Sequence, residues 1–287
     1  MQRDERITGQ RTDPAPSIRP GRGWARRGLV ALSAPMVLFL LLPLLALIVR
    51  VDPGSIAAHL VGREVAAAIR LSLATTAATL ALTVAAGTPV AYIVARWRFR
   101  GRMLLDTLLD LPMVLPPSVA GIALLIAFGR RGLVGRYLDD LGINLAFTSL
   151  AVVLAQTFVA APFYIKAAIA GFAGADRELE QAAALDGAGP RQVFWLITLP
   201  LCWPALLGGA IMAWARALGE FGATIIFAGN FPGRTQTMPL AIYLGFELDF
   251  EVALTLSLVL LVCSFAVIFL VKRLLRQRIS ASPLGGE

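Results

Sequence analysis

The sequence predicts an all-α polytopic membrane protein with six transmembrane helices and a cytoplasmic helix–turn–helix. Of its 287 residues, 57% are apolar and only 15% are charged, whereas charged residues make up about 25% of an average soluble domain. Six uncharged runs of 19 to 25 residues follow one another along the chain, and each can cross a hydrocarbon core of about 30 Å as a helix. None of them alternates apolar and polar residues, which disfavours a membrane barrel.

The six runs are separated by segments that carry the charges. In chain order they are Leu29–Val49, Leu71–Val94, Leu111–Gly129, Leu141–Ile165, Gln192–Ala215 and Val252–Val271. The third run contains Pro112 and the pair Pro116-Pro117, whose freed backbone groups must be satisfied by neighbouring helices or water. We therefore expect this segment to line the interior of the bundle, with a simple kink of no functional role as the alternative.

Basic residues indicate which side of the membrane each segment occupies. Of the 26 Lys and Arg residues, 18 lie in four alternate segments, namely 1–28, 95–110, 166–191 and 272–287. By the positive-inside rule these segments are cytoplasmic, and so are both termini.

The same reading predicts the domain organisation. We expect a basic cytoplasmic arm over 1–28, an additional first transmembrane helix over 29–50, the main transmembrane domain over 66–272 and a cytoplasmic tail over 273–287. A cleaved signal peptide is the rival interpretation of the first run, but 21 apolar residues exceed the usual apolar core of such a peptide.

Several kinds of chemistry are excluded by what the sequence lacks. His59 is the only histidine, and Cys202 and Cys263 lie in apolar runs, so neither a metal site nor a catalytic triad is expected. Neither of the two lysines, Lys166 and Lys272, follows a glycine, so there is no phosphate-binding loop for ATP. We expect no cofactor in this chain and no enzymatic activity of its own. The net charge of +8 is explained by the membrane and not by nucleic acid.

Residues 172–200 do not fit a plain bundle. Asp176 can cap a helix, Gly187 can end it in the left-handed conformation, and Pro190 suits the first turn of a second helix. Spacings of i, i+3 and i+4 give the first helix one small apolar face, formed by Leu179, Ala182 and Ala183. Small side chains allow another surface to approach closely, although an alanine-rich surface helix without a partner is the alternative.

This segment resembles the EAA-x3-G-x9-I-x-LP pattern of permease subunits of ATP-binding-cassette importers. The matching residues, with every gap retained, are Gln181, Ala182, Ala183, Gly187, Ile197, Leu199 and Pro200. Gln181 stands where the pattern has Glu, and Glu180 lies just before it. The resemblance implies the type I importer permease fold, with 172–200 as the coupling loop that docks into a separate ATPase subunit.

Longer stretches resemble the molybdate permeases of that superfamily. They are LPMVLPPSVAG at 111–121, FGRRGLVG at 128–135, EQAAALDGAG at 180–189 and ARALGEFGATIIFAGNFPGRTQTMPLAIY at 215–243. Sulfate permeases share the LGEFGA-type segment. The resemblance implies import of molybdate, or of tungstate or sulfate, across a bacterial inner membrane. It also implies a homodimer, two ATPase subunits that bind ATP and Mg²⁺, and a periplasmic or extracellular molybdate-binding protein.

The fifth run leads to two charged residues at helical spacing. Arg216 lies about 24 Å along a helix from Pro200, and Glu220 follows at i+4, so the two can pair. Charges at that depth are costly unless they are paired or face a water-filled path. We expect Arg216, Glu220 and the adjacent Phe221 at a gate, with a purely structural ion pair as the alternative.

Two weaker expectations concern polar residues near the membrane surfaces. The outer segment 230–239 carries Asn230, Arg234, Thr235 and Thr237, which we expect to face the binding protein, an ordinary solvated loop being the alternative. Asp106 and Asp110 indicate interfacial charge, and less readily a proton relay. An ion-coupled secondary anion transporter remains the alternative function.

Overall fold

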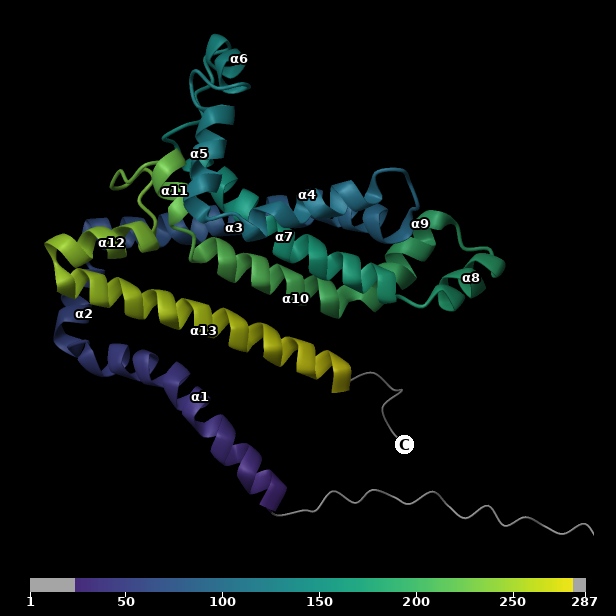
Figure 1. Ribbon diagram of the computed structural model, residues 1–287, viewed down its shortest axis with the longest axis horizontal. Helices are drawn as coiled ribbons and strands as arrows, with labels where there is room; N and C mark the ends of the chain where they lie inside the picture. The colour runs from purple at the N-terminus through teal and green to yellow at the C-terminus, as the bar shows by residue number, and fades with distance from the viewer. Residues whose placement is uncertain (1–23, 281–287) are drawn as a thin grey trace, which may run out of the picture. The chain divides into compact units, whose positions relative to one another are not determined.

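The computed structural model describes residues 24–280, which form helices joined by short connections (Figure 1). The chain divides into two units, the first ending at Arg50 and the second beginning at Val51. Residues 1–23 of the predicted basic arm and 281–287 of the predicted tail lie outside the described residues.

The first unit contains one long helix, α1, which runs from Trp24 to Arg50 and includes the predicted run Leu29–Val49. Between Gly28 and Arg50 every residue except the half-buried Leu47 is exposed. An apolar helix of this length with an uncovered surface is suited to lipid.

The second unit is built around long helices that pack along one another. In chain order its elements are α2 (Pro53–Leu60), α3 (Arg63–Arg96), α4 (Arg102–Val114), α5 (Pro117–Phe128), α6 (Gly135–Asp140), α7 (Ser149–Gly174), α8 (Arg177–Leu185), α9 (Pro190–Val193), the π-helical turn η1 (Phe194–Thr198), α10 (Leu199–Leu218), α11 (Gly222–Phe227), α12 (Met238–Leu248) and α13 (Phe250–Ser280).

Five of the six predicted runs lie in helices long and apolar enough to cross a membrane. These are α1, α3, α7, the continuous helix from Pro190 to Leu218, and α13. The third run is instead divided between α4 and α5, which meet at 115°. The described residues therefore provide five spans, or six if this bent pair is counted as one.

The bend between α4 and α5 follows from two consecutive prolines. A residue that precedes proline is forced out of the helical region, and both Leu115 (ψ 134°) and Pro116 (ψ 134°) are extended. Pro112 lies inside α4 without breaking it. The expectation that this segment lines the interior holds for α5, whose Ala120 and Leu124 are buried, but α4 has no buried residue in the chain as described.

The fourth predicted run overlaps helix α7 only in part. We expected a helix over Leu141–Ile165, but α7 begins at Ser149 and continues to Gly174. The hydroxyl of Thr148 caps its first turn by accepting from the Ala151 amide at 3.2 Å. Lys166 therefore lies inside the helix and not at its boundary. The predicted run was ended before Lys166 because this residue is charged, but a charged residue that has an ionic partner can lie within a helix.

The short helices α2, α6, α11 and α12 were not expected. With 6 to 11 residues each, they are too short to produce the periodicity that identifies a helix in a sequence. The second and sixth predicted runs, by contrast, fall wholly within α3 and α13.

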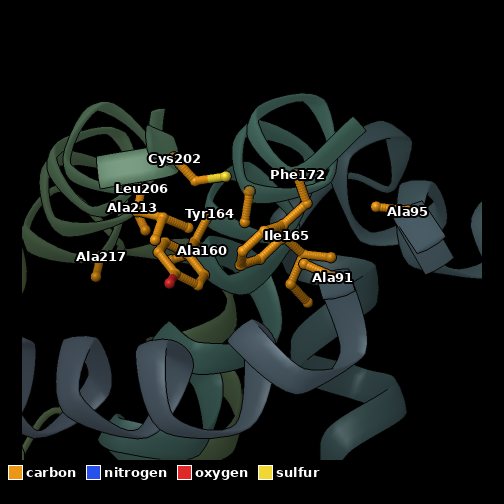
Figure 2. Close-up of a cluster of buried hydrophobic side chains, with 11 residues drawn as sticks. Ala91, Ala95, Ala160, Tyr164, Ile165, Phe172, Cys202, Leu206, Ala213 and Ala217 are labelled. Atoms are coloured by element: carbon orange, nitrogen blue, oxygen red, sulfur yellow. The ribbon is translucent and has the colours of Figure 1, made fainter. Parts of the chain in front are cut away.

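Helix α7 occupies the centre of the second unit and packs along α3 and α10. Figure 2 shows Tyr164, Ile165 and Phe172 of α7 between small residues of α3 and α10, such as Ala91 and Ala213. The approach is close because α10 carries Gly209 at the contact. A Cβ at this position would lie 2.7 Å from the Ala167 Cβ and 3.1 Å from the Tyr164 carbonyl oxygen.

One face of α3 carries a row of buried hydroxyl groups. Its members are Ser72, Thr75, Thr76, Thr79 and Thr83. The Thr75 hydroxyl donates to the Leu71 carbonyl of its own helix at 2.9 Å, whereas Thr79 donates to Gln156 of α7 at 3.1 Å. Thr79, and Ser72 through the Met238 amide of α12, thus connect α3 with its neighbours by polar contacts in an otherwise apolar bundle.

We predict that Gly209→Ala destabilises the protein and that Gly208→Ala does not. A Cβ at Gly208 meets nothing within 4 Å, so the control gains only the better helix propensity of alanine. At Gly209 the added methyl group forces α10 away from α7, which should cost about 1–3 kcal/mol. Thermal unfolding of the purified protein in detergent measures both, and equal transition temperatures would contradict the packing described.

Candidate functional site

The segment 172–200 folds into the expected helix–turn–helix. Asp176 caps α8 by accepting from the Glu178 amide at 2.9 Å, Gly187 follows the helix with φ +90°, and Pro190 is the first residue of α9. Each of these three local predictions is confirmed. Only glycine adopts such a φ at no steric cost, so Gly187 determines the turn between the two helices.

The residues of the sequence pattern are distributed around this motif. Gln181 and Ala182 are exposed on α8, whereas Ala183 is half-buried. After the turn, in η1 and at the start of α10, Ile197 and Leu199 are half-buried and Pro200 is exposed. The outward face of α8 also presents apolar side chains, since Leu179 is 48% and Leu185 is 89% exposed. These apolar side chains on α8 are therefore accessible at its surface.

Glu180 turns toward the body of the protein. Its Oε1 accepts from Nη2 of Arg96, at the end of α3, at 2.6 Å and from the Thr198 hydroxyl at 2.7 Å. The side chains of Arg96 and Glu180 are only 8% and 20% exposed. Sequence reasoning missed both partners of Glu180. Arg96 was not among the expected site residues, and its separation from Glu180 by 84 residues leaves no local signal.

Arg216 and Glu220 form the expected ion pair, with Nη1 and Oε2 2.7 Å apart. The local structure differs from a continuous helix, because α10 ends at Leu218 and Glu220 lies in the turn before α11. Glu220 is 1% exposed, and its Oε1 also accepts from the Ala223 amide at 2.8 Å. The half-buried Phe221 packs on Tyr243 of α12, with ring centroids 5.2 Å apart.

The turn that contains Glu220 lies against the bend between α4 and α5. A Cβ at Gly222 would lie 2.8 Å from the Pro117 Cβ, and a Cβ at Gly121 would lie 2.9 Å from the Ala223 carbonyl oxygen. Two interrupted helices therefore meet at backbone distance, with the ion pair beside them. Broken helices that meet in this manner are where membrane transporters place polar groups at depth.

The outer segment 230–239 differs from the expected partner-facing loop. Thr235 and Thr237 are buried within the chain, at 0% and 1% exposure. Thr235 closes its own loop by accepting from the Phe231 amide and donating to the Gly229 carbonyl. This corrects the expectation that both threonines face a partner. Arg234 is exposed and Asn230 is half-buried.

A second ion cluster joins α4 to α7. The Lys166 ammonium lies 2.7 Å from a carboxylate oxygen of Asp106 and 2.9 Å from one of Asp110. Their i, i+4 spacing brings both carboxylates to one side of α4. The carboxylates that were expected at the interface are thus paired with Lys166, a residue that the hydropathy pattern had placed outside the membrane-spanning helix.

The chain is similar in sequence to known membrane transport proteins. The profile of a family described as binding-protein-dependent transport system inner membrane component matches residues 87–280. The molybdenum transport system permease protein ModB of Mycobacterium tuberculosis is 47% identical over 234 residues, which cover 81% of this chain and 88% of ModB. ModB of Escherichia coli K12 is 44% identical, covering 61% and 77%. The sulfate transport system permease protein CysT of Salmonella typhimurium is 34% identical, covering 83% and 87%.

Solved structures bear on the fold alone. A bacterial alginate ABC transporter, determined with an alginate pentasaccharide-bound periplasmic protein, superimposes with a TM-score of 0.71 at 16% identity, over 90% of this chain and 96% of that one. The MetNI methionine ABC transporter gives a TM-score of 0.56 at 17% identity, over 73% and 94%. The predicted fold class, that of importer permeases, is confirmed.

We predict that Lys166→Met lowers thermal stability, because it leaves Asp106 and Asp110 facing each other without a cation. All three side chains are partly exposed, so solvent screens the repulsion and the loss should be about 1 kcal/mol. Lys272→Met, which removes an exposed lysine from α13, is the control. Unfolding of the two purified variants in detergent would contradict the assignment if their stabilities were equal.

Proposed function

We propose that this chain, which belongs to the family of binding-protein-dependent transport system inner membrane components, is the permease subunit of an ATP-driven importer of molybdate. The observation that carries this proposal is 47% identity to a molybdenum permease over 81% of the chain. Identity to the sulfate permease is 34%, so molybdate is favoured and sulfate and tungstate are the substrates to test against it.

A separate ATPase subunit supplies the energy, because the chain has no phosphate-binding loop. We propose that it docks on the coupling loop 172–200, through residues around Gln181, Ala182, Ala183 and Gly187. ATPase subunits of this kind act in pairs, and the chain offers one helix–turn–helix. Two copies of the permease would therefore bind two ATPases, with a periplasmic or extracellular binding protein on the opposite side.

The docking surface must face the cytoplasm, where ATP is present. With α8 and α9 on that side, both termini would also be cytoplasmic, in agreement with the 18 of 26 basic residues found in cytoplasmic segments. We assign 66–272 to the permease domain and 29–50 to an additional span, with the arm 1–28 and the tail 273–287 in the cytoplasm.

Transport would proceed by alternating access. Closure of the ATPase pair moves α8 and α9, the helices attached to them rotate, and the cavity between the two permease copies opens outward. We place the gate at Arg216, Glu220 and Phe221. The arginine would attract the dianion, and the glutamate would neutralise the charge of the arginine until the gate opens. Asn230 and Arg234 are the residues of the outer loop that remain to contact the binding protein.

The test is reconstitution in liposomes with the ATPase and the binding protein. ATP hydrolysis and uptake are measured with no anion and with molybdate, tungstate or sulfate. Stimulation that requires the loaded binding protein, and is greatest with molybdate, is the expected result. Uptake that follows a proton or sodium gradient with no ATPase present would overturn the proposal in favour of a secondary transporter.

In this system we predict that Gly187→Val uncouples ATP hydrolysis from uptake, whereas Gly187→Asn retains coupling. Nothing lies within 4 Å of a Cβ at this position, so space is not limiting. The φ of +90° strains any side chain, but it strains β-branched valine far more than asparagine, which is enriched at positive φ. Uptake per ATP should fall about tenfold or more for valine, as is typical when a backbone strain of about 1–3 kcal/mol displaces a contact surface. Equal coupling in both variants would contradict this role of the turn.

We also predict that Arg216→Ala lowers uptake far more than folding or assembly, by at least about tenfold, the scale expected when one member of a buried charge pair is removed. The variant leaves Glu220 without its counter-charge, so the double variant Arg216→Met/Glu220→Gln serves as the control for stability. If the double variant transports normally, the pair is structural. If it is stable but inactive, the charged pair is required for transport itself.

A further inference from the structure

The described structure contains one junction at which three elements of the predicted coupling machinery meet. Glu180 of α8 accepts hydrogen bonds from Arg96, the last residue of α3, and from Thr198, which ends the π-helical turn before α10. We propose that Glu180 is a positioning residue that makes α3 and α10 follow the movement of α8. This inference rests on the proposed function, in which α8 contacts the ATPase.

Helix α8 has little else to hold it. None of its residues is buried, and its packing is chiefly with the adjoining α9 and η1. Figure 1 shows α8 and α9 at one end of α7 and α10, extending beyond them. With no buried residue, α8 depends on specific polar contacts to reach elements other than those that adjoin it in the chain. The hydrogen bonds of Glu180 provide such contacts to two separate helices.

The junction is protected from water, which strengthens it. The Arg96 side chain is 8% exposed and Thr198 is 1% exposed. Hydrogen bonds to a charged group are about twice as strong as neutral ones, and little solvent competes for them here. Arg96 also lies at the C-terminus of α3, where the helix dipole favours a cation. The contact is thus strong enough to persist while the elements move.

The surroundings of the junction leave room for movement. Tyr92, one turn before Arg96, contacts Phe172 and Phe194 edge to face, with ring centroids 5.3 and 5.2 Å apart. Beside it a cavity of about 580 Å³ is bounded by α3, α7, η1 and α10, and includes Tyr92, Phe194 and Trp203. Close-packed helices resist relative shifts, but helices bordering a cavity can move toward one another. The π-helical turn, a deviation frequent at functional positions, lies at this same place.

The departure from the family pattern at Gln181 fits this assignment. Successive residues of a helix point about 100° apart, so Glu180 and Gln181 face different directions. Gln181 is exposed and Glu180 is half-buried. The carboxylate of Glu180 therefore makes a contact within the chain. The surface offered to the ATPase carries the neutral Gln181 at the position where the pattern has glutamate.

The test uses the full complex of permease, ATPase and binding protein in liposomes, with molybdate transported per ATP hydrolysed as the readout. Glu180→Gln and Thr198→Val should each lower this ratio, Glu180→Gln by about tenfold, which corresponds to the loss of about 1.4 kcal/mol. The amount of ATPase that co-purifies should stay within about twofold of the wild type, because a positioning residue does not form the docking surface. Thr198→Ser, which keeps the hydroxyl, should retain coupling.

Glu251→Gln is the control, since it removes an exposed carboxylate from α13, outside the coupling loop, and should leave the ratio unchanged. A double-mutant cycle with Arg96→Met and Glu180→Met should be non-additive, as the second substitution removes a charge that the first left unpaired.

Two results would overturn the inference. One is a normal transport ratio in both Glu180→Gln and Thr198→Val. The other is a loss of uptake that tracks a loss of assembled complex, because Glu180 would then serve folding alone. Failure of the wild-type complex to form or to import molybdate would instead refute the proposed function, so the two failures are distinguishable.

Discussion

The close contact of α7 with α3 and α10 is the constraint on which the second unit depends. Lipid tails are as apolar as the side chains they surround, so helices in a bilayer associate through packing and hydrogen bonds and not through the hydrophobic effect. Gly209 lets α10 approach the backbone of α7 at Tyr164. The volume left between the helices is filled by Tyr164 and Phe172, which are fully buried. The bends, turns and ion pairs at both ends of the bundle are positioned by this central layer.

The two ends of the bundle are held together by different forces. At the end that carries α11, Gly121 and Gly222 allow α5 and α11 to touch at backbone distance, and the buried Glu220 connects α10 to α11. At the end that carries α8, the elements are joined through the carboxylate of Glu180 beside a cavity. The first end is held by backbone contact, whereas the second is held by polar contacts beside a cavity. In the mechanism we propose, movement that begins at α8 would be conveyed toward the closely packed end next to the gate.

Much of the fold could be predicted from the sequence because hydropathy reports which segments prefer lipid. The caps of α8 were predictable for a related reason, since Asp176, Gly187 and Pro190 act through local backbone geometry. The displacement of α7 was not, because hydropathy treats the charge of Lys166 as the end of a span, and its neutralising partners lie on another helix. Family resemblance indicated the coupling loop but not the direction of its side chains.

The errors in the candidate site have a common origin. Hydroxyl groups in a turn-rich segment look available to a partner, but Thr235 and Thr237 are buried, and Thr235 bonds within its own loop. Composition cannot distinguish a polar group that binds a ligand from one that satisfies a neighbouring amide. Arg96 and Glu180 show the same limit, because a pair 84 residues apart is decided by tertiary packing alone.

The hydroxyl row on α3 has a consequence for how the chain is assembled in the membrane. A hydroxyl in a helix can bond to the carbonyl four residues earlier, as Thr75 does with Leu71, so α3 can enter lipid before any neighbour is present. Thr79 instead bonds to Gln156 on α7, and Ser72 accepts from the Met238 amide of α12. These bonds form only when later segments arrive in the correct register. The row therefore lets α3 insert early and then favours the register in which α7 and α12 pack against it.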